Sequence, residues 1–233
     1  MRLFLILIAL IALPAPAAAD IKARYDGAGG SAALLEVNDK GEARLGGVGT
    51  DSYSLFIAGG DYVVLEHGGA PAAARYEDFK AAIDAIVMKP MRDVLGRETP
   101  RPRPPAPSPL IETGRAEVGA FAGRRFEWPG GAGERRAYAI VSDAPELRPL
   151  GPPMAKLLMR MPTFEESIGG ARPAALDALA AMLGSVALLK LDEQFALAEV
   201  SFDPVPEERF RLPSKILNRE EVAAMLNRTG EGE

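Results

Sequence analysis

The chain offers few residues that could carry out chemistry, and the first of them is its one histidine. His67 could be the base of a Ser-His-Asp triad, but the sequence contains no G-x-S-x-G nucleophile motif. Its neighbours Glu66 and Gly68-Gly69 are typical of a hairpin, so we expect a solvated turn histidine. A zinc site takes three or four protein ligands, and one histidine without any cysteine cannot supply a typical one. We therefore expect no catalytic residue, no metal and no cofactor.

Carboxylate doublets and glycine clusters are the next patterns with a possible chemical role. Paired acids could hydrolyse a glycoside, but that role depends on their separation in space and not on adjacency. The doublets flank apolar runs, which favours solvated ends of elements: Glu165-Glu166, Asp192-Glu193, Glu207-Glu208 and Glu220-Glu221. The glycine clusters at 27–30, 46–49 and 130–133 lack the following helix and Lys-Ser/Thr pair of a phosphate loop. We interpret them as loops between strands, and a hydrolase is the least favoured class.

Apolar side chains at helical spacing are the pattern that we retain as a candidate site. Many methionines fall in or beside predicted helices, and their flexible thioethers suit a surface that accommodates variable apolar ligands. Plain core packing is the alternative interpretation. The candidate ligand-binding residues are Phe79, Ile83, Val87, Met154, Leu158 and Met161.

Short strands joined by turns account for the first part of the chain. The candidate strands are 21–25, 33–38, 43–45, 52–58, 62–66 and 72–75. Connections this short predict an antiparallel meander, because parallel strands need crossovers of a dozen or more residues. In the strand at 52–58 one face is apolar, and Phe56 interrupts the opposite face, which carries Ser52 and Ser54.

A helical period begins at Glu77, and Pro90 should kink or stop this helix near Met88. Strands return at 110–118, 124–128, 135–142, 186–191 and 195–202. Between them we expect a helix over 154–161 with Pro153 as its first residue, and a second over 173–183.

The chain should end in a short helix that Asn218 caps, with Glu221 three residues later, and a polar tail at 228–233. No alternating βαβ pattern occurs along the chain. We therefore predict an α+β fold with a curved antiparallel sheet and helices packed on one face.

The first 19 residues predict a signal peptide. Arg2 precedes an apolar run from Leu3 to Leu13, and Ala17-Ala18-Ala19 supplies the small residues of a cleavage site. The alternative, a retained anchor, is disfavoured because crossing a membrane takes about 20 apolar residues. No cysteine is present for lipid attachment. We expect a soluble periplasmic or secreted protein that begins at Asp20 and has no transmembrane segment.

Composition is ordinary for a globular protein, with 48% hydrophobic residues and a formal net charge of −5. This mild acidity argues against nucleic acid as a partner, because phosphate neutralisation needs basic surfaces. We expect one domain over 20–227. The proline-rich segment 97–109 should be an exposed semi-rigid connection, and a ligand for an aromatic groove is the alternative.

Three stretches resemble periplasmic proteins of the LolA-like superfamily. They are Tyr62-Val63-Val64-Leu65, the run from Thr113 to Gly119 that leads into Phe126-Glu127-Trp128, and Val200-Ser201-Phe202 followed by Phe210-Arg211-Leu212-Pro213. The resemblance implies a half-open antiparallel β-barrel whose concave apolar face is covered by helices. In the characterised outer-membrane lipoprotein carriers, that cavity holds lipoprotein acyl chains.

What the resemblance implies is a non-catalytic carrier or sensor that binds a lipid or lipoprotein acyl group. The proline-rich segment and the helical section at 154–183 depart from the characterised carriers. A structural or interaction module of the cell envelope, with the same barrel and a filled core, is the alternative function.

Overall fold

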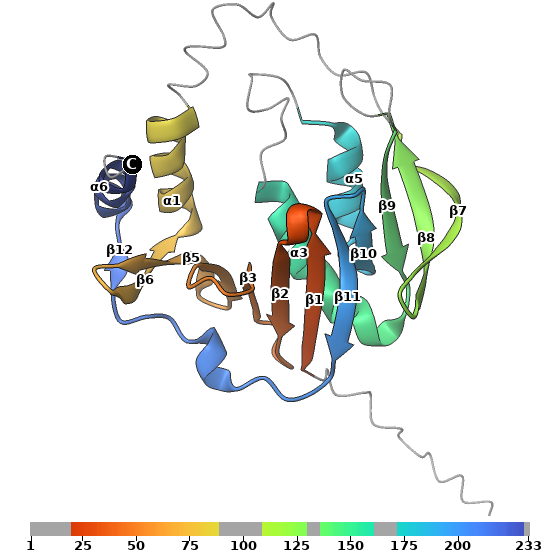
Figure 1. Ribbon diagram of the computed structural model, residues 1–233, viewed down its shortest axis with the longest axis horizontal. Coiled ribbons are helices and arrows are strands. Elements are labelled where there is room, and N and C mark those ends of the chain that lie inside the picture. Colours follow the sequence, from red (N-terminus) through yellow and green to blue (C-terminus); the bar gives the residue numbers. More distant parts are fainter. Residues whose placement is uncertain (1–19, 89–108, 130–135, 161–171, 231–233) are drawn as a thin grey trace, which may run out of the picture.

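The computed structural model describes residues 20–88, 109–129, 136–160 and 172–230, and these contain twelve strands and four α-helices (Figure 1). The strands are β1 (Ile21–Gly27), β2 (Ala32–Val37), β3 (Ala43–Gly47), β4 (Tyr53–Ile57), β5 (Gly60–His67), β6 (Ala70–Arg75), β7 (Ile111–Val118), β8 (Phe121–Trp128), β9 (Ala137–Ser142), β10 (Ala187–Leu191), β11 (Phe195–Ser201) and β12 (Ile216–Leu217). The helices are α1 (Tyr76–Ile83), α3 (Gly151–Arg160), α5 (Ala174–Met182) and α6 (Arg219–Gly230). The expected signal peptide at 1–19 and the proline-rich residues 97–108 lie outside the described residues.

All twelve strands belong to one mixed sheet, in the order β12-β6-β5-β4-β3-β2-β1-β11-β10-β9-β8-β7. Strand β1 pairs with both β2 and β11, so it joins the first meander to the second group of strands. The edge strands of this order are β12 and β7, and the described sheet is not closed. In the view of Figure 1, β5 and β6 run roughly horizontally, whereas β1 and β2 run roughly vertically.

The prediction of an antiparallel sheet is correct for all but one of the strand pairs. Strand β12 runs parallel to β6, with Ile216 opposite Ala73 and Leu217 opposite Ala74. The chain reaches β12 from β11 through the long connection 202–215, and such a connection allows a parallel pair that a hairpin does not. The sheet is therefore mixed.

Both faces of β4 and β5 are covered, which explains the position of Phe56. Strand pairing places Ser54 and Phe56 on one face with Val63 and Asp61. Leu55 on the opposite face packs in a cluster with Tyr62, Val64, Ala73, Val205 and Phe210. Phe56, which interrupts the serine face in the sequence pattern, lies beneath Arg160 of α3, while the connection 202–215 covers the Leu55 face.

The main core lies between the sheet and the helices α3 and α5. It contains apolar residues of β1, β2 and β8–β11 together with Met154, Leu158 and Leu179 of the two helices. Gly151 begins α3 where no side chain fits, since a Cβ there would lie 2.1 Å from the Val186 carbonyl oxygen and 2.2 Å from that of Leu183. The helix start predicted at Pro153 is thus two residues late, because close packing and not proline determines it.

The connection 202–215 is held to the sheet by a buried ion pair. The Glu36 side chain is only 6% exposed, and it accepts hydrogen bonds from Arg44 Nη1 at 3.0 Å and Arg209 Nη2 at 2.7 Å. Two cations thus compensate one buried carboxylate, as burial of a charge requires.

The C-terminal helix has the predicted cap. The Asn218 N–H donates to Glu221 Oε2 at 2.9 Å, and the Glu221 N–H donates to Asn218 Oδ1 at 3.0 Å. The tail expected from residue 228 begins later, because α6 continues to Gly230 and the Arg228 side chain donates to the Ala224 carbonyl within the helix.

Candidate functional site

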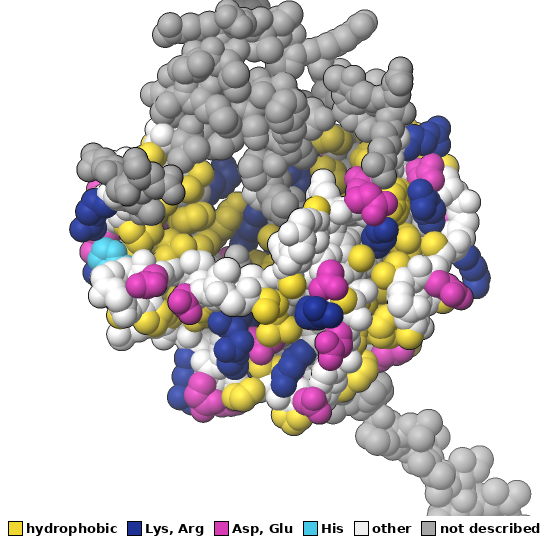
Figure 2. All heavy atoms as spheres, viewed as in Figure 1, with side chains coloured by type: hydrophobic (Ala, Val, Ile, Leu, Met, Phe, Trp, Pro, Cys, Tyr) yellow, Lys and Arg dark blue, Asp and Glu magenta, His cyan; other side chains and the backbone are white. Residues whose placement is uncertain are grey.

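An apolar cavity of about 540 Å³ lies between the sheet and the helices α1 and α3. This volume falls within the roughly 300–1,000 Å³ of small-molecule sites. Figure 2 shows the surface hollowed between the α1 side of the molecule and β1–β2, with hydrophobic side chains inside the hollow. The lining consists of Tyr25, Gly27, Ser31, Ala32, Ala33, Leu45, Gly46, Gly47, Ser52, Tyr53, Ser54, Val63, Leu65, Phe79, Met154, Leu157, Gln194 and Phe195. None of these described lining residues carries a charge.

The floor of the cavity comes from one row of the sheet. Leu45 pairs with Ser54, and Ser54 pairs with Val63, so the three side chains lie on the same face. Residues that face each other across an antiparallel pair lie close enough to form a continuous surface. The floor is thus aliphatic apart from the single hydroxyl of Ser54.

The walls are helical and aromatic. Phe79 lies on α1, while Met154 and Leu157 lie one turn apart on α3. Tyr25 and Phe195 meet edge to face, with ring centroids 5.8 Å apart and planes at 84°. This arrangement is favourable for aromatic pairs and holds both rings in place.

Tyr25 contributes its aromatic ring to the cavity wall, and its phenol does not serve as an acid there. Its hydroxyl donates to the Leu188 carbonyl at 3.0 Å, and burial raises the pKa of the phenol well above its ordinary value of 10.0. Since the hydroxyl already has a partner within the fold, the residue presents an apolar surface to the cavity.

The rim is built from small residues of the turns at one end of the sheet. Gly27 and Ser31 flank the turn after β1, and Gly46, Gly47 and Ser52 flank the turn between β3 and β4. At Gly46 a Cβ would lie 2.8 Å from the Tyr53 Cβ, so a larger residue would force these two strands apart. The glycine clusters at 27–30 and 46–49 lie only partly in loops between strands, because Gly27 ends β1 and Gly46 and Gly47 belong to β3; the cluster at 130–133 lies outside the described residues.

A charged cluster, Asp61, Lys156 and Arg160, lies beside the cavity where α3 crosses β5. The Asp61 carboxylate accepts a hydrogen bond from Lys156 Nζ at 2.9 Å and another from Arg160 Nη2. The Arg160 guanidinium lies 3.9 Å from the centroid of the Tyr76 ring and 4.9 Å from that of Phe56. The cluster joins α3 to the sheet and to the start of α1.

The structure brings two of the six predicted ligand-binding residues to the cavity. Phe79 and Met154 line it. Ile83 is half-buried on α1 away from the lining, and Leu158 is buried in the main core. The Val87 side chain and Met161 lie outside the described residues.

Leu157 and the sheet residues of the lining were missed by the sequence prediction. Leu157 and Leu158 have the same chemical character, and only the rotation of α3 against the sheet decides which of them faces the cavity. For Tyr25, Leu45 and Val63, strand alternation indicates a shared inward face, but it does not distinguish a packed position from a cavity position.

None of the described titratable groups considered first belongs to the lining of the cavity. His67 ends β5 opposite Ala70, in the predicted hairpin, and Figure 2 shows the histidine at the molecular surface. The described carboxylate doublets lie on separate elements, and one carboxylate of each has a partner within the fold. Asp192 accepts a hydrogen bond from the Tyr138 N–H, Glu207 pairs with Lys40, and Glu221 caps α6. The doublet Glu165-Glu166 lies outside the described residues.

Metal ligands do not cluster in the described parts of the chain, where no three His, Cys, Asp or Glu side chains are placed to hold an ion. Of the described helices, none has the length and apolar character needed to cross a membrane. No protein-family model and no curated protein matches this chain.

Proposed function

We propose that this protein is a non-catalytic periplasmic protein that binds a lipid or lipoprotein acyl group, as a carrier or sensor. The observation that carries the proposal is the cavity of about 540 Å³ with an uncharged, largely aliphatic lining. A long acyl chain needs such a surface, because each buried methylene contributes about 0.8 kcal/mol.

The cavity favours this function over an envelope module with a filled core. Protein interiors are packed nearly as densely as organic crystals, and voids much larger than a water molecule are uncommon. The open hollow of about 540 Å³ leaves the apolar side chains that line it without the packing partners that a filled core would give them. Its opening to the surface also gives a ligand a route of entry (Figure 2).

The proposal includes a LolA-like half-barrel. An open sheet, the change of strand direction between β1–β2 and β5–β6, and the position of α1 and α3 on the same face support it (Figure 1). The residues at 1–19, which have the sequence features of a signal peptide, support export to the periplasm.

The affinity should be modest. Burial of ten methylenes contributes about 8 kcal/mol, and the loss of translational and rotational freedom on association opposes it by several kcal/mol. The expected dissociation constant is therefore micromolar or weaker.

Titration with a fluorescent long-chain fatty acid tests the proposal. Leu157→Asp should weaken binding at least about tenfold, because it places an unpaired charge against the chain. The matched control is Met159→Asp on the same helix, where the side chain is 52% exposed and binding should be unchanged. Circular dichroism verifies that both variants fold. Absence of saturable binding by the wild-type protein, or equal binding by a folded Leu157→Asp variant, would favour the filled-core module.

A further inference from the structure

The floor of the cavity contains one hydroxyl that the fold leaves unused. Ser54 is half-buried and lines the cavity, and its partners across the strands, Leu45 and Val63, are aliphatic. Within the described residues the Ser54 hydroxyl has no hydrogen-bond partner. Its oxygen is also absent from the fully buried atoms without a partner, so it is accessible from the cavity. A few such polar groups in an apolar pocket fix the orientation of a ligand.

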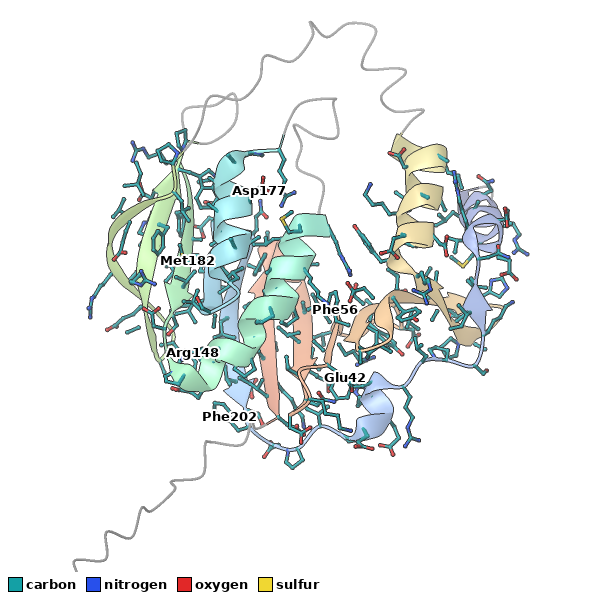
Figure 3. All side chains as sticks on the ribbon, turned by 180° about the vertical axis from the view of Figure 1, so that it is seen from behind. Glu42, Phe56, Arg148, Asp177, Met182 and Phe202 are labelled. Carbon is teal, nitrogen blue, oxygen red and sulfur yellow. The ribbon has the colours of Figure 1, made fainter. Side chains whose placement is uncertain are left out.

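Strand β4 determines how deep this hydroxyl lies. Ser52, Ser54 and Phe56 are spaced by two residues and therefore lie on one face of the strand. Ser52 is exposed at the rim, and Ser54 is about 7 Å farther in. Figure 3 places Phe56 between α3 and the β4–β5 part of the sheet, where its ring centroid lies 4.9 Å from the Arg160 guanidinium. A ligand group at Ser54 is thus just inside an open rim.

The surroundings of Ser54 do not suit an anionic headgroup. No described lining residue carries a charge, so a carboxylate among them would be buried without a cation. The charged residues next to the rim are acidic, since Asp51 precedes Ser52 and Glu193 precedes Gln194. Their negative charges repel an anion. An uncharged headgroup avoids both costs.

The volume of the cavity suits a single acyl chain. An apolar protein cavity of about 150 Å³ holds one benzene molecule. By the same ratio of volume to carbon atoms, a cavity of about 540 Å³ holds about 20 carbon atoms. One long acyl chain fits this volume, and two do not.

We propose that the cavity takes a single-chain uncharged acyl ester, such as a monoacylglycerol, and that the Ser54 hydroxyl donates to the ester carbonyl. The aliphatic floor and the helices receive the chain, while the head extends past Ser52 to the rim, where its hydroxyls remain in water. An ester carbonyl accepts the hydrogen bond without bringing a charge into the lining. This inference rests on the proposed acyl binding and specifies the headgroup and the number of chains.

Three lipids with the same hydrocarbon chain test the inference on the wild-type protein: monooleoylglycerol, the corresponding oleyl glycerol ether, and oleate. The ether has the same head and chain and lacks only the carbonyl oxygen. One hydrogen bond to an uncharged acceptor changes a binding constant by about threefold to tenfold. Monooleoylglycerol should therefore bind at least about threefold more tightly than the ether and than oleate. Native mass spectrometry should find one monooleoylglycerol per protein, and two would overturn the single-chain assignment.

The variant Ser54→Ala should bind the ester and the ether equally, with the affinity for the ether unchanged. Ser54→Thr is the matched control, because it retains a hydroxyl at this position and should retain the preference for the ester. Circular dichroism verifies that both variants fold.

Equal wild-type affinities for ester and ether, or an undiminished preference in folded Ser54→Ala, would overturn the inference while leaving acyl binding intact. Binding of oleate as tight as that of monooleoylglycerol would overturn the uncharged headgroup. If none of the three lipids binds, the proposed function itself fails.

Discussion

Val63 and Val64 are neighbours on β5 with opposite environments, and this contrast provides a sharp test of the cavity. Val63 lines the cavity on the helix-covered face, whereas Val64 is fully buried on the other face against the cluster that includes Val205 and Phe210. Replacing each by phenylalanine adds the same volume to the same strand. Only the first has space available.

The two variants should therefore change stability in opposite directions. Val63→Phe fills part of an apolar cavity of about 540 Å³ and should raise the free energy of unfolding by about 1 kcal/mol. Val64→Phe overpacks a close-packed cluster and should lower that free energy by about 1–3 kcal/mol. Urea denaturation followed by tryptophan fluorescence measures both, through Trp128, the one tryptophan of the chain.

The affinity for the fluorescent fatty acid should also differ between Val63→Phe and Val64→Phe. If the new ring at position 63 displaces about three methylenes of the acyl chain, the loss is about 2.4 kcal/mol, or about fiftyfold in affinity. Val64→Phe leaves the cavity lining intact and should bind the fluorescent fatty acid as the wild type does. Destabilisation of both variants by similar amounts would refute the reasoning, because it would mean that the space beside Val63 is already filled.

Two further outcomes are expected. Burial raises the pKa of Tyr25, so the unfolded chain loses this proton near pH 10 while the folded protein keeps it. Stability should then fall as the pH rises above 10, and Tyr25→Phe should flatten that decline in alkaline urea titrations while costing about 1 kcal/mol at neutral pH. An unchanged alkaline slope in the variant would exclude Tyr25 as its source. N-terminal sequencing of the exported protein should begin Asp20-Ile21-Lys22, and a mature chain that starts at Met1 and stays with the membranes would identify the first segment as an anchor.

Local patterns predicted the elements well because their causes are local. The six strands of the first meander and the turns between them follow from alternation and from glycine-containing turns, both of which act over a few residues. The Asn218–Glu221 cap likewise depends on two side chains three positions apart. Errors occurred where a distant segment decided the outcome: Gly151 begins α3 because it packs against the Leu183 and Val186 carbonyls, and β12 joins β6 after a long connection.

The candidate site was predicted only in part for the same reason. Helical periodicity placed Phe79 and Met154 on apolar helix faces, and both line the cavity. It could not choose between Leu157 and Leu158, because that depends on how α3 is rotated against the sheet. The cluster around Arg160 gave no sequence signal, since Asp61, Tyr76 and Arg160 come from separate elements.

By itself, the sequence determined the α+β class, the order of the strands and helices along the chain apart from β12, and the content of one histidine and no cysteine. These follow from composition and from periods of two and about 3.6 residues, which a chain expresses without regard to its distant parts. Only the tertiary structure decided that the space between sheet and helices stays partly empty and that an arginine with an unused donor is buried where α3 meets β5. Empty volume and an unsatisfied donor are properties of how separate surfaces meet, so no local pattern in the chain encodes them.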